Sequence, residues 1–463
     1  MKPSKKYWFS LACLLILAMI LVACGGNAAP AEEPAAPAEE AAPTEVAAME
    51  EAAPAEESTE ATVPSGEGSS VTLWSHSAGN PDEIAVVEQM IADYNAMQDN
   101  YEVILESFPQ ESYNDSVAAA SIAGSLPCIV DLDAPTVPNF AWSGYIQPLP
   151  VDRAEIDALN ILENDIGVYN GEVYSLGQFD VALLIYARQS ILDEYGIRTP
   201  TIEEPWTLEE FNAALDTLKD SGEFEYALDV NAGYSGEWWP YAYSPMLQSA
   251  GGDLINRDTF LEAEGVLNGD EATTWAEWFG GLFENGYTPA TPADDQGFNQ
   301  GKIALWYTGS WAADSVLEAW GDDALFLPPP DFGNGPVIGA GSWQFGVSST
   351  CEHPEGAAEF VMFTMTPENV ALMSETSSLI PTTAEGAALT EKYAEGGIFR
   401  PFFDMAQAYA FIRPPTPGYL MLSSQFEQAG LSIRDGGNVQ DALDDAVDAI
   451  ERDIQDNSGY GFQ

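Results

Sequence analysis

The stretch that decides the fold runs from Val71 to Phe108 and reads "VTLWSHSAGNPDEIAVVEQMIADYNAMQDNYEVILESF". Its two ends, 71–75 and 101–108, have the apolar and β-branched composition of strands. Between them Asn80 can cap a helix, Pro81 suits the first helical position, and apolar residues recur at helical spacing. Strand, helix and strand in this order predict an α/β fold with a parallel sheet covered by helices.

The same alternation continues along the chain. A helix is expected near 112–123, and "CIVDLD" at 128–133, "ALLIYAR" at 182–188, "KIALWYTG" at 302–309 and "WQFGVSST" at 343–350 are expected to be strands. Thr207 and Glu210 predict a capping box at the start of a helix, and apolar spacing over 439–454 predicts an amphipathic C-terminal helix. The region from Val71 to Gln463 is too long for one ordinary core, so two lobes are expected.

The N-terminal segment has the pattern of a secreted lipoprotein. Residues 1–23 join basic lysines to a short apolar run, which is typical of a signal peptide. They lead into "LVACGG" at 21–26, a lipobox pattern in which Cys24 is lipidated and becomes the new N-terminus. Residues 24–70 are rich in Ala, Pro and Glu and are predicted to be a disordered tether. We therefore expect an extracytoplasmic protein held at the outer face of the cell membrane by the lipid on Cys24.

The acidity of the chain argues against several classes of ligand. Its formal net charge of −60 repels nucleic acid, phosphate and anionic lipid head groups, and it favours neutral or cationic ligands. Most of this charge fits adaptation to salty or acidic surroundings. Of the four cysteines, Cys13 leaves with the signal peptide and Cys24 takes the lipid. The remaining Cys128 and Cys351 are expected to pair outside the cell, and the alternative is two separate buried thiols.

The residues expected of an enzyme are scarce. The two histidines, His76 and His353, lie far apart in the sequence, no cluster has zinc spacing, and "GFNQGK" at 297–302 is one residue short of a phosphate loop. His76 is interpreted as a hydrogen-bonding residue rather than a metal ligand. We predict no catalytic residue, no metal and no cofactor. A surface glycosidase with two catalytic carboxylates is the alternative from another class.

Aromatic and acidic residues lie together at the predicted carboxyl ends of strands, where open α/β sheets bind ligands. Rings offer apolar faces to C–H groups while carboxylates accept hydrogen bonds from hydroxyls, which together suit a sugar. These residues are Trp74, Ser75, His76, Asp131, Asp133, Gln178, Asp180, Glu237, Trp238, Trp239, Trp311 and Trp343.

The stretch "GEWWPYAYSP" at 236–245 is the most aromatic of these segments. Adjacent residues of an extended segment point to opposite sides. We therefore expect Trp238 to pack into the core and Trp239 to face the ligand as a stacking platform, with Glu237 nearby.

Five motifs in sequence order resemble the extracellular solute-binding proteins (family 1) of carbohydrate ABC transporters, the group typified by maltose-binding protein. The chain departs from that pattern at Cys128, where an aspartate is usual, and this departure supports pairing with Cys351. The motifs are "GSLPCIVDLDAPTVPNFAWSGYIQPL" (124–149), "PWTLEEF" (205–211), "FNQGKIALWYTGSW" (298–311), "PEGAAEFVMFTMTPENV" (354–370) and "LIPTT" (379–383).

This resemblance implies a two-lobed periplasmic-binding fold of type II, with the ligand in a cleft between lobes joined by hinge crossovers. Lobe one would comprise 71–180 and 341–393, and lobe two 185–336 and 394–463. A monomer would capture a mono- or oligosaccharide and deliver it to the permease subunits of an ABC transporter. The same fold binding a polyamine or a peptide is the first alternative.

The resemblance also ranks the ligand residues. Asp133, Asp180, Trp239, Trp311 and Trp343 form the first rank, and Ser75, His76, Glu237, Trp238, Gly341 and Arg413 form the second. Arg413 could clamp an acidic sugar or pair with one of the carboxylates, and the pairing is the favoured interpretation.

Overall fold

The structure is a computed structural model that describes residues 69–291 and 296–462. The predicted signal peptide, the lipidation site at Cys24 and nearly all of the predicted tether lie outside the described residues. Among the helices of the described part, none is long and apolar enough to cross a membrane.

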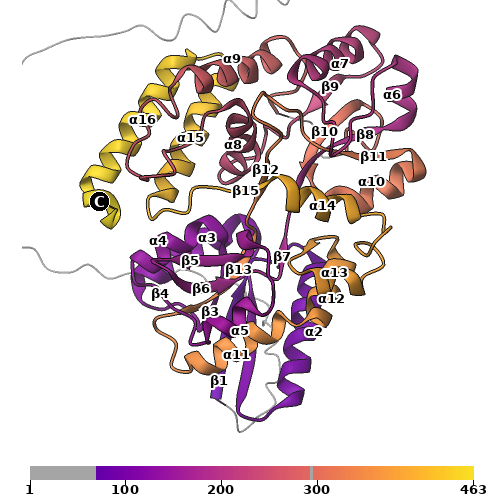
Figure 1. Ribbon diagram of the computed structural model, residues 1–463. Helices are drawn as coiled ribbons and strands as arrows, with labels where there is room; N and C mark the ends of the chain where they lie inside the picture. The colour runs from indigo at the N-terminus through magenta and orange to yellow at the C-terminus, as the bar shows by residue number, and fades with distance from the viewer. Residues whose placement is uncertain (1–68, 292–295, 463) are drawn as a thin grey trace, which may run out of the picture. The chain divides into compact units, whose positions relative to one another are not determined.

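The opening stretch forms one edge of a seven-stranded sheet (Figure 1). Its two strands pair in parallel from Ser69 beside Tyr101 to Ser75 beside Ser107, as the alternation predicts. The sheet order is β2-β1-β3-β13-β6-β5, and β4 pairs with β13, which runs antiparallel to β3. The strands are β1 (Ser69–Ser75), β2 (Tyr101–Ser107), β3 (Ile129–Asp133), β4 (Ile146–Gln147), β5 (Ile166–Tyr169), β6 (Glu172–Leu176) and β13 (Trp343–Ser348).

Helices around this sheet begin and end close to where the sequence predicts. Asn80 caps the first of them by accepting a hydrogen bond from the Glu83 N–H, and Pro81 is its first residue. The helix that follows β2 ends at Gly124, whose φ of 66° provides the left-handed cap. The helices are α2 (Pro81–Met97), α3 (Gln110–Ala123), α4 (Val137–Trp142), α5 (Arg153–Asp157), α11 (Pro354–Thr364), α12 (Pro367–Ser377) and α13 (Ala384–Leu389).

A second, four-stranded sheet has the order β11-β8-β10-β9. Every residue of β8 and β10 is buried, because helices cover the sheet. Its strands are β8 (Leu183–Arg188), β9 (Tyr226–Asp229), β10 (Ile303–Gly309) and β11 (Ala324–Leu327). The helices of this part are α6 (Gln189–Tyr195), α7 (Leu208–Ser221), α8 (Trp238–Ala250), α9 (Asp270–Glu284), α10 (Ala313–Trp320), α14 (Arg400–Tyr409), α15 (Tyr419–Arg434) and α16 (Val439–Asp456).

Two sequence predictions for these helices are confirmed. The capping box of α7 is complete: Thr207 accepts from the Glu210 N–H, and Glu210 accepts from the Thr207 N–H. The C-terminal helix α16 buries the apolar face expected from its spacing, including Leu443, Val447 and Ile450.

Short strand pairs lie where the chain passes between the two sheets. β7 (Phe179–Asp180), just before β8, pairs with β14 (Ile380–Pro381). β12 (Ile338–Ala340), just before β13, pairs with β15 (Ala410–Ile412). The two sheets, each with its own apolar core, are the two lobes of the predicted fold. The exact boundaries of the lobes stay a prediction.

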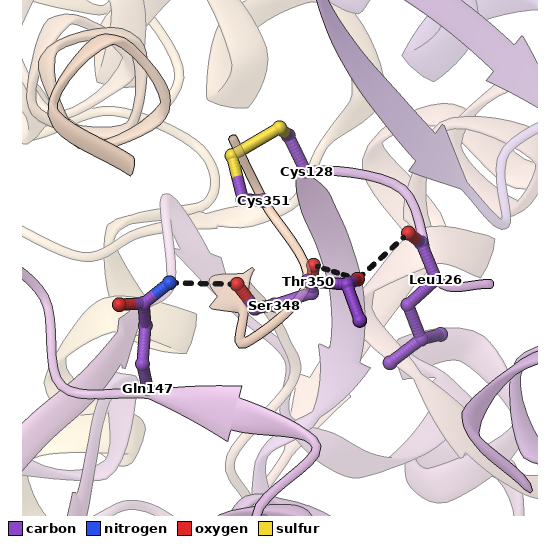
Figure 2. The surroundings of a disulfide bond; sticks show 6 residues. All are labelled: Leu126, Cys128, Gln147, Ser348, Thr350 and Cys351. Atoms are coloured by element: carbon purple, nitrogen blue, oxygen red, sulfur yellow. Dashed lines mark hydrogen bonds between the residues drawn. A yellow bond between two sulfur atoms is a disulfide. The ribbon is translucent and has the colours of Figure 1, made fainter. Parts of the chain in front are cut away.

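The cysteine pair is bonded, as expected. Cys128, which precedes β3, is joined to Cys351, which follows β13, with a Cα–Cα distance of 4.4 Å. Figure 2 shows the hydrogen bonds beside it, in which Thr350 donates to the Leu126 carbonyl at 3.1 Å and the Gln147 amide donates to the Ser348 carbonyl at 2.8 Å. The disulfide therefore fixes two neighbouring antiparallel strands at one end.

The aromatic stretch 236–245 is helical rather than extended, which corrects the sequence interpretation. It forms the N-terminal half of α8, with Glu237 at its N-cap. Pro240 lies in the first turn, where its missing N–H costs no helical hydrogen bond. Packing of α8 against α9 and α15 overrides the modest helix propensity of its aromatic residues.

Candidate ligand-binding site

One edge of the seven-stranded sheet collects predicted ligand residues from distant parts of the chain. β1 and β3 are parallel neighbours, so their carboxyl ends, at Ser75 and Asp133, reach the same edge. β13 runs the other way and begins there, which places Trp343 opposite Asp133. The expectation that strand ends bring these side chains together therefore agrees with the observed register.

His76 lies at this edge between two carboxylates. Its Nδ1 is 2.6 Å from Oδ2 of Asp131, and its Nε2 is 3.3 Å from Oε1 of Glu83. Burial alone would lower the pKa of His76, but the charges of Asp131 and Glu83 outweigh it, and the pKa is raised. An imidazolium can donate from both ring nitrogens, so this arrangement suits the charged form.

The His76 ring also organises an aromatic neighbour. It stacks on Trp343 with ring centroids 3.8 Å apart and an interplanar angle of 12°. A cavity of about 190 Å³ adjoins this group. Its lining residues are His76, Ser77, Gly79, Asn80, Glu83 and Gln110. The cavity has room for ordered waters or part of a small polar ligand.

Arg413 is a second buried cation, and it gathers three other predicted site residues. Its two Nη groups donate to the two oxygens of Asp133, each at 2.8 Å, in a bidentate pair. Nη1 also donates to Glu237, and Nη2 donates to the Gly341 carbonyl at 2.7 Å. Burial acts to lower the pKa of Arg413, yet nearby acidic groups raise it well above its usual value. The favoured pairing of Arg413 with a carboxylate is present in the structure.

Glu237 has further donors around it. Tyr419 donates its hydroxyl to Oε1, and Ser423 donates to Oε2 at 2.8 Å. Both donors come from α15, whereas Glu237 precedes α8. We call Arg413, Asp133, Glu237, Tyr419 and Ser423 the Arg413 cluster, and His76, Asp131, Glu83 and Trp343 the His76 cluster.

Gly341 takes part through its backbone. Its φ of 79° lies in the left-handed region, and a Cβ there would come within 3.0 Å of Ala134 and Ile412. This conformation directs its carbonyl to Arg413 and its N–H to Oδ1 of Asp180, at 3.1 Å. Asp180 is fully buried, and its connection to the other predicted residues is the hydrogen bond that it accepts from the Gly341 N–H.

Some polar atoms near Arg413 have no partner among the described residues. They are Nε of Arg413, Oδ2 of Asp180 and the hydroxyl of Tyr241, and all three are buried. The Tyr241 ring centroid lies 5.0 Å from Cζ of Arg413. Burial raises the pKa of Tyr241 well above its usual value, and the charge of Asp180 raises it further. Unsatisfied buried polar atoms cost free energy. One unused donor in the Arg413 cluster, the Nε–H, and two unpartnered polar atoms of its neighbours Asp180 and Tyr241 therefore lie in this region.

Trp311 provides an exposed aromatic face next to these polar groups. It lies in the short helix η3 (Ser310–Ala312), is 42% exposed, and has its ring centroid 6.4 Å from that of Tyr241. A Cβ at Gly309 would lie 1.9 Å from the Trp311 ring, so the glycine allows this ring to pack over the backbone. Tyr241 therefore links the Arg413 cluster to the exposed ring.

The burial of the two adjacent tryptophans is the opposite of what the sequence interpretation expected. Trp239 has no exposed surface, packs against Tyr243 and Phe279, and donates to the Tyr234 carbonyl at 2.9 Å. Trp238 is half-buried, and its ring contacts that of Trp311 at 6.3 Å between centroids. The reason is the helix: adjacent residues are rotated by about 100°, and α9 and α15 cover the side on which Trp239 lies.

Several residues of these clusters were missed from the sequence. Glu83 lies in the predicted helix start, eight residues after the end of β1 at Ser75, and was not singled out. Tyr241 lies in the aromatic stretch but was not singled out. Tyr419 and Ser423 carry no signal in the sequence, because they depend on how α15 packs near α8. Among the described residues, no group of three or more His, Cys, Asp or Glu could hold a metal ion.

The fold and site define a class: a two-lobed α/β binding protein whose candidate ligand groups lie at strand ends and at the segments between sheets. The chain belongs to the bacterial extracellular solute-binding protein family, whose model matches residues 89–401.

Relatives and solved structures agree with this membership. A lipoprotein encoded beside oleD in Streptomyces antibioticus is 22% identical over 66% of this chain and 69% of its own length. The maltotriose-binding protein of Pyrococcus abyssi is 23% identical over 77% of this chain and 75% of its own length. The GacH receptor of Streptomyces glaucescens, solved unliganded and with acarbose, has a TM-score of 0.70 at 20% identity. That similarity covers 84% of this chain and 99% of the GacH chain.

Proposed function

We propose that this chain binds an uncharged oligosaccharide and delivers it to the permease of an ABC transporter. The observation that carries the proposal is the exposed Trp311 ring, joined through Tyr241 to the buried Arg413 cluster. A pyranose has apolar C–H faces and many hydroxyls, so it suits a ring beside hydrogen-bonding groups. The maltotriose-binding relative and the acarbose-bound neighbour support a sugar as the ligand.

The ion pairs that Arg413 makes with Asp133 and Glu237 favour an uncharged sugar over an acidic one. All four Nη hydrogens of Arg413 have acceptors in Asp133, Glu237 and the Gly341 carbonyl. Its four Nη hydrogens are therefore not free to clamp an anionic sugar, and its one remaining N–H, on Nε, is buried. Asp133 and Glu237 already face a cation, which also disfavours a polyamine. Their carboxylates still have lone pairs to accept hydrogen bonds from neutral hydroxyls.

Capture would use closure of the two lobes about the crossover segments. A ligand that contacts both lobes favours the closed state by its differential affinity for the two states. The chain itself would do no chemistry. The lipobox at Cys24 and the Streptomyces antibioticus lipoprotein support anchoring at the outer face of the membrane. The tether would keep the binding protein close to its permease.

Calorimetric titration of the full chain tests the proposal. We expect binding of a neutral maltooligosaccharide or another neutral oligosaccharide, and none of spermidine or a tripeptide. Trp311→Ala should weaken sugar binding roughly fivefold to tenfold, because it removes about 1 kcal/mol of ring contact. Trp320→Ala is the matched control, since Trp320 is half-buried at the end of α10 and packs against Arg188 instead. Binding of spermidine or a peptide, with no response to any sugar, would overturn the proposal.

A further inference from the structure

Two aspartates are fully buried where the segments that connect the sheets meet. Asp180 ends β7, and Asp165 ends the short helix η2 (Glu163–Asp165). Both side chains are 0% exposed. Asp180 lies in the first segment that connects the sheets, and Asp165 packs beside it, because η2 contacts β7.

Each aspartate uses one carboxylate oxygen to bind a different segment. Oδ1 of Asp180 accepts from the N–H of Val181 at 2.8 Å and from the N–H of Gly341 at 3.1 Å. Oδ2 of Asp165 accepts from the Thr382 hydroxyl at 2.7 Å. Gly341 lies between β12 and β13, and Thr382 follows β14. The two acids therefore tie together all three of these segments.

The other oxygen of each acid has no partner. Oδ1 of Asp165 and Oδ2 of Asp180 are both buried, and neither has a hydrogen bond to any described residue. Two ionised carboxylates that are both buried repel each other and lose solvation. A single proton removes one charge and supplies a donor, whereas Ca²⁺ would require six or more oxygen ligands.

The charged groups around Asp165 and Asp180 favour a bound proton at the pair. Burial raises the pKa of Asp180 to about 7, and burial together with the Asp180 charge raises that of Asp165 further above its usual value. Arg413 acts on Asp180 in the opposite direction, and Tyr241 is the other titratable group beside it. From α12, which packs on β7, Glu375 instead accepts from the backbone N–H groups of Glu391 and Lys392.

We propose that Asp165 and Asp180 form a proton-binding site, in which the two side chains together hold one proton at neutral pH. The proton comes from solvent, and the pair then carries one negative charge instead of two. Loss of the proton would place a second negative charge where the connecting segments meet, and the repulsion would weaken the contacts between these segments. This site does not depend on the identity of the ligand.

Infrared spectroscopy of the ligand-free full chain tests the shared proton. At about pH 8 ordinary aspartates and glutamates are ionised, so a protonated carboxyl band reports a strongly perturbed acid. We expect the band in the native protein and its loss in Asp165→Asn, whose amide can donate to Asp180 without a proton. Asp115→Asn, at an exposed position of α3, is the control and should leave the band unchanged. An unchanged band in Asp165→Asn would overturn the proposal.

Thermal unfolding against pH gives a second readout. A group whose pKa is raised on folding stabilises the fold at low pH, and this stability is lost as pH rises through the folded value. The native melting temperature should therefore fall between about pH 4 and pH 8, and this decrease should be smaller in Asp165→Asn.

If Asp165→Asn does not fold, the test is instead the release of protons when the native chain unfolds at about pH 7. No proton release would contradict the site. If Ca²⁺ raises the melting temperature and a chelator reverses the increase, the pair binds a cation, and the proposal of a bound proton is overturned.

Discussion

The His76 cluster and the Arg413 cluster each surround a buried cation with carboxylates, but they are built from different parts of the chain. Each holds one buried cation against two carboxylates: His76 against Asp131 and Glu83, Arg413 against Asp133 and Glu237. Both cations are at most 5% exposed. A buried charge needs such partners, because leaving water costs several kcal/mol per ion.

The clusters differ in how much of the chain they require. The charged residues of the His76 cluster lie just after β1, in α2 and in β3, so this cluster forms together with the seven-stranded sheet. The Arg413 cluster joins the end of β3, the start of α8 and a segment just after β15, so it forms only when both sheets are in place. An arginine stays charged at any physiological pH, whereas a histidine can lose its proton. We infer that the first cluster is a pH-sensitive part of one lobe and that the second is a fixed connection between segments.

The largest expected effect comes from removing the arginine. Arg413→Met leaves the buried Asp133 and the partly buried Glu237 without their counter-ion, which should lower the free energy of unfolding by about 3–5 kcal/mol. Chemical denaturation of the full chain measures it. Arg153→Met is the matched control: Arg153 forms an exposed pair with Asp157 and should cost under about 1 kcal/mol. Equal losses in the two variants would mean that Arg413 is not a central connection.

Next in size is the pair of tryptophans that follow Glu237. Trp239→Ala removes a fully buried ring and should cost about 3–5 kcal/mol of unfolding free energy. Trp238→Ala should cost less stability and weaken sugar binding instead, because this ring contacts Trp311. Denaturation and calorimetry on both variants separate the two effects. A larger stability loss in Trp238→Ala would show that the packing of α8 described here is wrong.

The His76 cluster should respond to substitution in a pH-dependent way. His76→Gln should cost about 1–3 kcal/mol near pH 6, where the imidazolium hydrogen-bonds to Asp131 and forms an ion pair with Glu83. Because the folded pKa is raised, this stabilisation is present below about pH 6.5 and is lost as pH rises through the folded value. The gap between native and variant stability should therefore narrow towards pH 9. His353→Gln, at the start of α11, is the control, and a gap that does not change with pH would contradict the charged state of His76.

The smallest effect is expected at the outer partner of Glu237. Ser423→Ala removes one hydrogen bond of 2.8 Å from a carboxylate that keeps Arg413 and Tyr419 as donors. We expect a loss of about 1 kcal/mol, measured by denaturation. A loss as large as that of Arg413→Met would indicate that Ser423, rather than the arginine, holds Glu237 in place.

The sequence predicted the fold well where the signals were local. Strand composition, the cap at Asn80, the capping box at Thr207 and Glu210 and the period of α16 each depend on neighbours in the chain. The disulfide was also expected, from compartment and family pattern. The conformation of α8 was missed because tertiary packing, rather than local propensity, makes this aromatic and proline-containing segment helical.

The site was predicted in part. Residues at strand ends could be found because parallel neighbours end at one edge of a sheet. The partners of Glu237 on α15 and the acid pair of Asp165 and Asp180 could not, since they depend on contacts between residues far apart in the sequence. The burial of single side chains could not be predicted from the sequence either. Asp180 and Trp239 are residue types that often contact ligands, but neither has any exposed surface.

The central claim is that Arg413 is an internal counter-ion, so that the site accepts neutral sugars and rejects acidic ones. The most direct test is calorimetric titration of the full chain with a neutral oligosaccharide that binds and with the same sugar carrying a uronic acid at one end. We predict that the carboxylated sugar binds at least about tenfold more weakly, a difference of about 1.4 kcal/mol. Equal or tighter binding of the acidic sugar would contradict the account, because it would require Arg413 to leave Asp133 and Glu237 for the ligand.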